Sequence, residues 1–326
     1  MIRYLVSRLA SSLVMIAIVS FLIFVVLRVL PGDPTVTRLG RGDGVSESAL
    51  EALRASLGLD QSIFVQYSKW ISGVLTGDFG RSYFSNFPVD VLLQQRVFAT
   101  LELAGAGLLI AIVIAVLLAV LPIWTRKTGV GRLIDGYITF GISAPPFVIG
   151  ILLILIVSGW LGWLPANGYV APEISLWENL RRLMLPALTL GIVVSAPLIR
   201  YLHASIEEVS SSSYVRTAIG KGIGWRRTVF RHIFPNALPP ALTALAVSVG
   251  SMLGGVAVVE IVFAWPGLGQ QVVDAVFKRD YPVIQAIVLL AAAAFVLTAL
   301  IVDILYGVLD PRLRLASRRP RAGRSA

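Results

Sequence analysis

Cysteine is absent from the 326-residue sequence, and histidine occurs only twice. Without cysteine, these residues can form neither a disulfide bond nor a thiolate metal site. Charged side chains are also scarce, because they make up 14% of the chain, whereas a typical soluble domain has roughly 25%. The hydrophobic fraction is 56% and the mean hydropathy is +0.82. This composition excludes a soluble globular protein and predicts a membrane protein.

Motifs for nucleotide and metal chemistry are missing as well. The sequence has no G-x-x-x-x-G-K-[ST] phosphate loop, no H-E-x-x-H zinc motif and no G-x-S-x-G nucleophile turn. The nearest approach to a phosphate loop, Gly220-Lys221, is followed by glycine and not by Ser or Thr. His203 and His232 are single histidines beside the expected cytoplasmic face, where a loop histidine usually has no chemical role. We therefore predict no catalytic residue, metal site or cofactor on the chain itself.

Six apolar runs are each long enough to cross a membrane, and none contains Asp, Glu, Lys or Arg. About 20 apolar residues in a helix span the roughly 30 Å of hydrocarbon in a bilayer. The runs are Leu9–Leu27, Leu103–Val120, Gly136–Ser158, Leu183–Ile199, Ala237–Val259 and Tyr281–Val302. The fourth run is short and contains Pro186 and Pro197, which membrane helices tolerate where neighbours satisfy the freed carbonyls. The sequence predicts an all-α polytopic membrane protein with six transmembrane helices.

Lys and Arg predict the orientation of these helices. Basic residues gather before the first run and after the second, fourth and sixth runs, and short basic loops stay on the cytoplasmic side. The other two short loops carry Arg181, Arg182, Lys278 and Arg279, each pair offset by two acidic residues. Both termini are therefore expected in the cytoplasm. The net charge of +10 reflects these loops and a basic tail, 307–326, which suit anionic lipid headgroups and not nucleic acid.

The segment 30–97 separates the first two runs and is expected outside the cell, as a folded segment. Ser48 and Glu51 have the spacing of a capping box, and Gly58 fits the end of a short helix. A second helix is predicted over Phe64–Leu75.

Aromatic side chains in this outer segment predict a surface that packs on another protein. We assign a docking role to Trp70, Phe79 and Tyr83. The alternative is a solvated spacer without a docking role.

Ionisable residues are absent from the middle of the six runs. Glu102, Glu260 and Asp303 lie near run ends, where we expect them to be capped or paired. Because proton-driven carriers need ionisable groups within the membrane, this pattern disfavours such a carrier.

The fifth run carries a stripe of small residues, Ala246, Gly250 and Gly254, at intervals of four. Small residues at this spacing let two helices approach closely in lipid. The stripe therefore predicts a packing face, either beside the transport pathway or with no part in transport.

The stretch 214–238, YVRTAIGKGIGWRRTVFRHIFPNAL, is basic and broken by glycines between two apolar runs. Helical spacing gives two apolar faces, the first formed by Val215, Ala218, Ile219 and Gly222, and the second by Val229, Phe230 and Ile233. Two short helices joined by a glycine turn fit a groove on another protein, and Pro235 is expected to end the second. The alternative is an amphipathic helix lying on lipid.

This stretch resembles the EAA loop of bacterial ABC-importer permeases. Arg216-Thr217-Ala218 takes the EAA position, Gly222 takes that of the glycine, and His232-Ile233-Phe234-Pro235 takes the end of the motif. Arg216 replaces the usual glutamate, as in the peptide-importer branch, so a salt bridge from that glutamate is not expected here.

Further stretches resemble the first permease subunit of dipeptide, oligopeptide and nickel importers. They are LPGDP at 30–34, GLDQSIFVQYSKWISGVLTGDFGRS at 58–82, SAPPFVIG at 143–150, EIVFAWPGLGQ at 260–270, RDYPVIQA at 279–286 and YGVLDPRLR at 306–314. The resemblance implies a type I ABC-importer permease fold in a bacterial cell membrane, with 1–29 as the first helix, 98–306 as a five-helix core and 205–236 as a coupling loop.

The resemblance also implies partners. They are a homologous second permease, two cytoplasmic ATPase subunits or a fused pair that bind ATP and Mg²⁺, and an extracytoplasmic peptide-binding protein. The binding protein would dock on Trp70, Phe79 and Tyr83. It implies ATPase coupling through Val215, Arg216, Thr217, Ala218, Ile219, Lys221, Gly222 and Gly224. The alternative function is a secondary carrier or channel of the same topology.

Overall fold

The computed structural model describes residues 2–29, 51, 60–124 and 129–309. Regular structure in these ranges is helical, apart from one isolated bridge between Arg81 and Pro88. The elements are α1 (Ile2–Val29), α4 (Ile63–Leu75), α5 (Val89–Trp124), α6 (Val130–Ser143), α7 (Pro146–Leu153), the π-helix η1 (Ile154–Trp160), α8 (Leu176–Ser210), α9 (Ser213–Gly220), α10 (Trp225–Thr228), the π-helix η2 (Val229–Ile233), α11 (Phe234–Val262), α12 (Leu268–Lys278) and α13 (Tyr281–Leu309).

Five described helical stretches are long and apolar enough to cross a membrane, and a sixth crossing results if one bent helix pair counts as a single span. The first, second, fourth, fifth and sixth predicted runs lie inside α1, α5, α8, α11 and α13. The predicted all-α polytopic fold is confirmed. The fourth helix, α8, continues well beyond its apolar run at both ends, and the Ser175 hydroxyl caps its start by accepting a hydrogen bond from Glu178 N at 3.3 Å.

The third predicted span, Gly136–Ser158, is wrong as one continuous helix. The chain forms α6 and then α7–η1, and the two parts are bent by 116°. Ala144 has φ −80° and ψ 128°, an extended conformation. Pro145 explains this bend, because a proline disfavours the helical conformation in the residue before it and has no N–H to donate.

The centre of the fold is α8, which packs most extensively against α5 and α11. Small residues allow this close approach: a Cβ atom on Gly191 would lie 2.4 Å from Cγ2 of Ile110 in α5. A Cβ atom on Gly141 of α6 would similarly lie 2.6 Å from that of Ala196 in α8. Close backbone contact through small residues is how helices pack in lipid, where no hydrophobic force drives them together.

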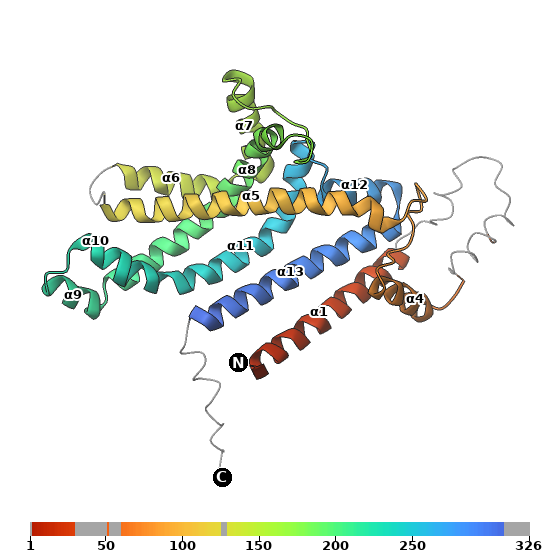
Figure 1. Ribbon diagram of the computed structural model, residues 1–326, viewed down its shortest axis with the longest axis horizontal. Coiled ribbons are helices and arrows are strands. Elements are labelled where there is room, and N and C mark those ends of the chain that lie inside the picture. Colours follow the sequence, from red (N-terminus) through yellow and green to blue (C-terminus); the bar gives the residue numbers. More distant parts are fainter. Residues whose placement is uncertain (1, 30–50, 52–59, 125–128, 310–326) are drawn as a thin grey trace, which may run out of the picture.

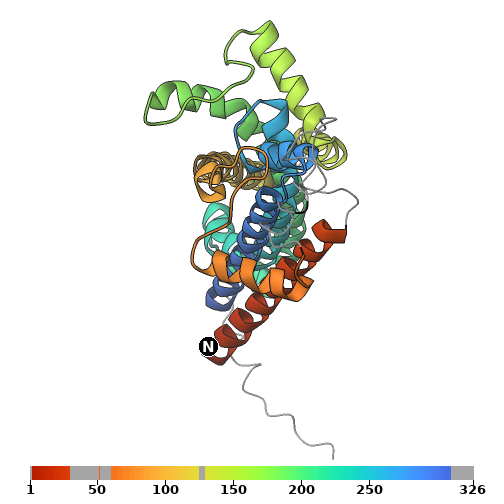
Figure 2. The same cartoon turned by 90° about the vertical axis from the view of Figure 1, so that its right-hand side faces the viewer.

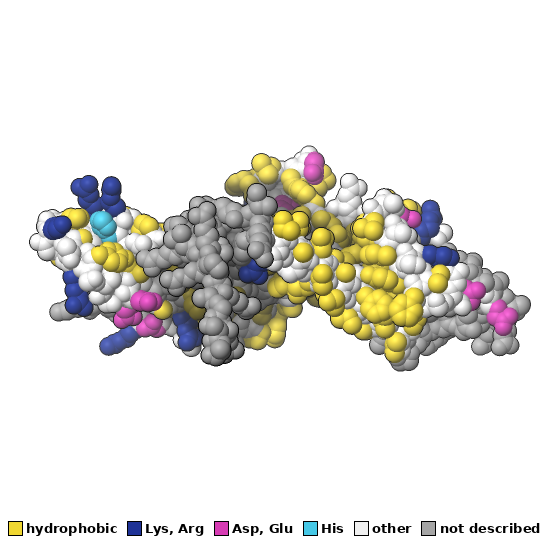
Figure 3. Space-filling model, turned by 90° about the horizontal axis from the view of Figure 1, so that it is seen from below, with side chains coloured by type: hydrophobic (Ala, Val, Ile, Leu, Met, Phe, Trp, Pro, Cys, Tyr) yellow, Lys and Arg dark blue, Asp and Glu magenta, His cyan; other side chains and the backbone are white. Residues whose placement is uncertain are grey.

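The long helices run between two ends of the molecule (Figure 1). The start of α1 and the hairpin of α9 and α10 lie toward one end, and α4 and α12 lie toward the other. In Figure 3, apolar side chains cover much of the described surface beside the grey residues, whereas Lys and Arg are most frequent at the α9–α10 end. This distribution matches a membrane-spanning middle with a basic cytoplasmic end.

The outer segment contains the predicted second helix, which is confirmed as α4. This helix lies across α1 (Figure 2), where the hydroxyls of Ser20 and Tyr67 are 2.8 Å apart. The other predicted helix, over Ser48–Gly58, lies outside the continuously described ranges. The second membrane helix, α5, begins at Val89, so it starts within the segment assigned to the outside.

Candidate coupling loop and outer docking surface

The chain turns between α9 and α10 on glycine. Gly222 has φ +78°, a left-handed conformation that glycine adopts without strain. Its N–H donates to the carbonyl of Ile219 at 2.9 Å, and Ile223 N donates to the carbonyl of Ala218 at 3.2 Å. The sequence-based expectation of two short helices joined by a glycine turn is therefore met.

The inner face of α9 is buried by the chain itself. Val215 is 1% exposed and Ala218 is 7% exposed. Val215 belongs to a cluster with Leu202 and Ile206 of α8 and with Val229 of η2. These two coupling candidates therefore pack inside the chain, because an apolar stripe on a short helix is covered by the nearest apolar surface, here the end of α8. Their structural role is to pack α9 against the membrane helices.

The outer face of α9 and of the turn is open. The exposed coupling candidates are Arg216, Thr217, Ile219, Lys221, Gly222 and Gly224. On the second half of the hairpin, Arg226, Arg227 and Arg231 are also exposed, together with Phe230 at 55% exposure. The exposed surface is thus basic with two apolar side chains, Ile219 and Phe230. We call these exposed residues the coupling face.

The predicted end of the second short helix at Pro235 is wrong. Helical structure runs without a break from Trp225 through η2 into α11, and Pro235 lies in the first turn of α11. A proline has no N–H to donate, and it lies just after the π-helix η2, where the regular i→i−4 hydrogen-bond pattern is already interrupted. The hairpin is therefore joined rigidly to a membrane helix, and a force on α10 reaches α11 directly.

The two histidines are separate from each other in the fold. His203 Nε2 lies 3.2 Å from the carbonyl of Leu118 and joins α8 to α5. His232 is half-buried in η2, and its carbonyl accepts a hydrogen bond from Asn236 at 2.7 Å. Both contacts are structural, and neither gives a histidine a role in chemistry.

At the other end of the molecule, Glu260 caps α12, as its position at a run end led us to expect. The carboxylate is fully buried and accepts hydrogen bonds from the Thr100 hydroxyl at 2.6 Å, Gly269 N at 2.7 Å and Gln270 N at 3.1 Å. Thr100 in turn accepts one from Leu268 N at 2.8 Å. The N–H groups in the first turn of α12 therefore donate to side chains of α5 and α11. The negative charge of Glu260 at this helix N-terminus is also favourable.

Glu102, the second end charge, is partly buried on α5 near the loop that precedes α8. Tyr169 of that loop packs edge-on against the buried Trp265, with ring centres 4.7 Å apart. Burial raises the pKa of Tyr169 to about 12, and the nearby charges of Glu102 and Glu173 add to this shift. The side chain of the third end charge, Asp303, lies outside the description.

The three aromatic residues predicted to dock a binding protein do not form one surface. Trp70 is half-buried against α1, with its ring centre 5.6 Å from that of Phe24. Phe79 and Tyr83 are also half-buried, and they pack on a cluster that includes α12 and the start of α13. All three have a packing role inside the chain, because each is half-buried against side chains of neighbouring elements.

A turn over residues 79–88 is fastened to the membrane helices by Asp280, which is 5% exposed. Its carboxylate accepts hydrogen bonds from the Ser82 hydroxyl and from Tyr83 N, the latter at 2.8 Å. The turn projects Phe84 and Phe87, each 60% exposed. Lys278 Nζ lies 4.6 Å from the centre of the Phe84 ring. We call Phe84, Phe87 and Lys278 the outer aromatic face, which no sequence pattern had distinguished.

The small-residue stripe on α11 is divided by the structure. A Cβ atom on Gly250 would lie 2.6 Å from the Phe295 ring, so this glycine packs against α13 of the same chain. Gly254 is exposed, and a Cβ atom there would meet nothing within 4 Å. The side chain of Ala246 lies outside the description. Only Gly254 is thus shown to be open to another chain.

Two family models together match nearly the whole chain. Residues 1–104 match the N-terminal part of membrane components of binding-protein-dependent transport systems, and residues 107–315 match the binding-protein-dependent transport system inner membrane component. A probable peptide ABC transporter permease protein, y4tP, of Sinorhizobium fredii is 37% identical, covering 95% of this chain and 99% of that protein. The glutathione transport system permease protein GsiC of Escherichia coli K12 is 38% identical, with coverage of 96% and 99%. A crystal structure of an amino acid ABC transporter with histidines is 20% identical, covers 68% of this chain and 94% of its own, and has a TM-score of 0.48.

Proposed function

Because the chain belongs to the family of binding-protein-dependent inner-membrane transport components, we propose that its cargo is a small peptide and that it forms half of the transport pathway. It is a multi-pass permease of an ABC importer in the bacterial inner membrane, and it is not itself an enzyme, because the ATPase resides on partner subunits. The peptide cargo is supported by the names of its full-length relatives, one a probable peptide permease and one a permease for glutathione, itself a short peptide.

The family assignment decides against the alternative of a secondary carrier or channel. Members of this family work in complexes with a second permease, with ATPase subunits and with a binding protein. We propose separate ATPase subunits or a fused pair as the source of energy, with ATP and Mg²⁺ bound there.

The observation that carries the proposed coupling is the continuous helix from α10 into α11. The coupling face is exposed on a hairpin whose other side packs on α5 and α8. An ATPase groove that grips this face differently in its open and closed forms would shift the membrane helices between two arrangements. Such a shift requires a difference in contact free energy between the two states.

We further propose that the binding protein docks on the outer aromatic face. Exposed aromatic side chains anchor protein interfaces, and Phe84 and Phe87 project from a turn that Asp280 holds in place. Gly254 is our candidate for contact with the second permease near the pathway.

Reconstitution in liposomes tests the proposal as a whole. The chain alone should neither hydrolyse ATP nor move peptide. Addition of the second permease, the ATPases and the binding protein should give ATP-dependent uptake of a labelled dipeptide or tripeptide. Uptake by the chain alone would overturn the coupling scheme, and ATP-driven uptake of another cargo with no response to peptide would overturn the peptide assignment.

A further inference from the structure

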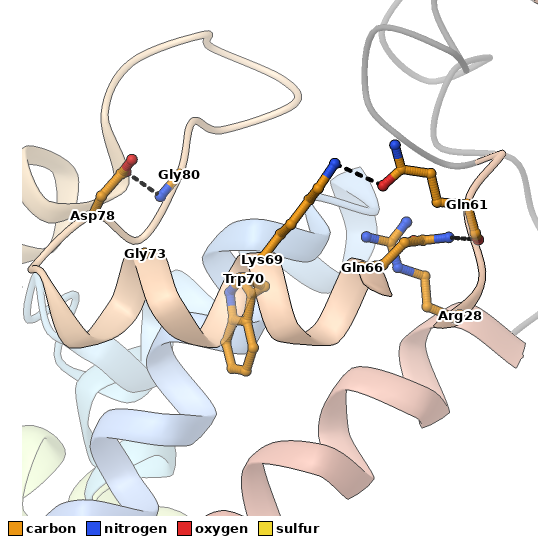
Figure 4. Close-up of a pocket in the computed structure, with 8 residues that line it drawn as sticks. All are labelled: Arg28, Gln61, Gln66, Lys69, Trp70, Gly73, Asp78 and Gly80. Atoms are coloured by element: carbon orange, nitrogen blue, oxygen red, sulfur yellow. Dashed lines mark hydrogen bonds between the residues drawn. The ribbon is translucent and has the colours of Figure 1, made fainter. Parts of the chain in front are cut away.

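A pocket of about 270 Å³ lies where α4 meets the end of α1, and the proposed transport function does not use it (Figure 4). Arg28 enters the pocket from the last turn of α1. Lys69 and Trp70 come from α4, and Asp78 comes from the turn after α4. The pocket therefore joins two elements that are distant in sequence.

Two side chains of the pocket have hydrogen-bond donors without an acceptor. Nε and Nη1 of Arg28 and Nε1 of Trp70 are buried atoms, and none has a hydrogen-bond partner in the described part of the chain. A guanidinium keeps its charge at any ordinary pH, so burial cannot be relieved by loss of a proton. Buried donors are normally satisfied, and these donors therefore require an acceptor from outside the described chain.

The other charged groups of the pocket already have partners. Lys69 Nζ donates to Oε1 of Gln61 at 2.8 Å, and Asp78 Oδ1 accepts from Gly80 N at 2.8 Å (Figure 4). Asp78 is thus held in its own turn. Two cationic side chains and one carboxylate leave the pocket with a positive balance, which favours an anionic ligand.

The surroundings of the pocket place it at the depth of lipid headgroups. The Arg28 guanidinium carbon lies 5.1 Å from the centre of the Phe24 ring, and Phe24 and Trp70 belong to one aromatic cluster. Aromatic rings concentrate where hydrocarbon meets water, and arginines near helix ends reach for the same level. On α4, Phe64 is 73% exposed and Leu75 is 81% exposed, as in a helix lying at a membrane surface.

We propose that this pocket binds the phosphate group of a phospholipid from the outer leaflet. The planar fork of Arg28 matches two phosphate oxygens, and Trp70 Nε1 supplies a third donor. Lys69 adds attraction without giving up its bond to Gln61. The volume approaches the lower limit of small-molecule sites, about 300 Å³, so there is room for a phosphate with part of its glycerol. The bound lipid connects α4 to α1.

Lipid titration of the assembled importer tests this site. The complex in detergent is titrated with dioctanoyl phosphatidylglycerol, and native mass spectrometry counts the bound lipids. Arg28→Gln should weaken the tightest lipid by about tenfold, the size expected for loss of a charged hydrogen-bonding partner, and Trp70→Phe should weaken it by about threefold. Arg8→Gln makes the same change at the opposite end of α1 and should leave this lipid in place.

A further variant controls for misfolding, and competing ligands distinguish the possible occupants of the pocket. Arg28→Lys retains the charge but loses the fork, so it should bind the lipid more weakly than the wild type; if Arg28→Gln does not assemble, Arg28→Lys decides. Wild-type affinity in the variant that assembles would overturn the proposal.

Competition experiments identify the occupant. Displacement of the lipid by an equal concentration of sodium phosphate would assign the site to the free anion, and displacement by the binding protein would assign it to a protein interface. Either result would overturn the lipid assignment.

Discussion

At the scale of single residues, substitutions of Gly222 distinguish the need for a left-handed backbone conformation from a contact with a partner protein. A Cβ atom there would meet nothing within 4 Å, and φ is +78°. Gly222→Ala and Gly222→Leu should therefore destabilise the isolated chain equally, by about 1–2 kcal/mol, the cost of a left-handed residue. Gly224, with φ −57° and open space around it, gives the control Gly224→Ala, which should be neutral.

In the assembled importer the two Gly222 variants should differ. The leucine side chain points into space that only a partner can occupy, so Gly222→Leu should lose peptide-stimulated ATPase activity where Gly222→Ala retains most of it. Thermal unfolding of the isolated chain and ATPase assays of the complex measure the two effects. Equal ATPase activity in the two variants would contradict a partner contact at Gly222.

Glu260 lies near the end of an apolar run in the sequence, and in the structure it caps α12. Glu260→Ala removes the acceptor of three hydrogen bonds, two of them from the first turn of α12. The unpaired N–H groups and the lost charged acceptor should lower the free energy of unfolding by about 3 kcal/mol. Glu260→Gln should lose less, because its amide oxygen can serve Gly269 and Gln270 while its nitrogen donates to Thr100.

Thermal or denaturant unfolding of the purified chain measures these losses. Glu173, an exposed carboxylate in the loop before α8, gives the control Glu173→Ala, expected within about 0.5 kcal/mol of the wild type. If Glu260→Ala unfolded like this control, the cap on α12 would not contribute to stability.

At the scale of elements, hydropathy predicted the membrane helices but not the neighbours of each helix. Val215 and Ala218 have the spacing of a buried face, and they are buried; periodicity cannot tell whether the covering surface belongs to the same chain or to a partner. Pro235 likewise fits either the end of one helix or the first turn of the next. Pro145 and Pro146 indicated a bend, yet the length of the apolar run was a stronger indication of a single span.

Two glycines on different helices make contrasting predictions about packing. Gly191→Ala on α8 would place a Cβ 2.4 Å from Ile110 and 3.5 Å from the backbone nitrogen of Ala111. This overpacking should cost about 1–3 kcal/mol and lower the melting temperature of the chain. Gly254→Ala on α11 meets open space and should stabilise the isolated helix slightly. Equal melting temperatures for the two variants would contradict the close packing of α8 on α5.

At the scale of the whole molecule, the chain connects a cytoplasmic hairpin to an outer surface through helices that pack on α8. The sequence predicted both ends, from the EAA-like loop and from the length of the outer segment. It assigned the docking role to Trp70, Phe79 and Tyr83, which are half-buried in packing contacts, because aromatic content does not distinguish rings that hold a segment in place from rings that project. That distinction depends on Asp280, which is distant in sequence from the turn it holds.

The outer aromatic face should determine how the binding protein stimulates the importer. Phe84→Ala combined with Phe87→Ala removes two exposed rings while leaving the turn fastened to Asp280. We expect at least a tenfold loss of affinity for the binding protein, since exposed aromatics at interfaces commonly contribute more than about 1 kcal/mol each. The measurement is ATPase activity of the reconstituted importer against binding-protein concentration. Phe140→Ala, which removes an exposed ring on membrane helix α6, is the control and should leave the half-maximal concentration unchanged. An unchanged value in the double variant would transfer the docking role to the loop between η1 and α8.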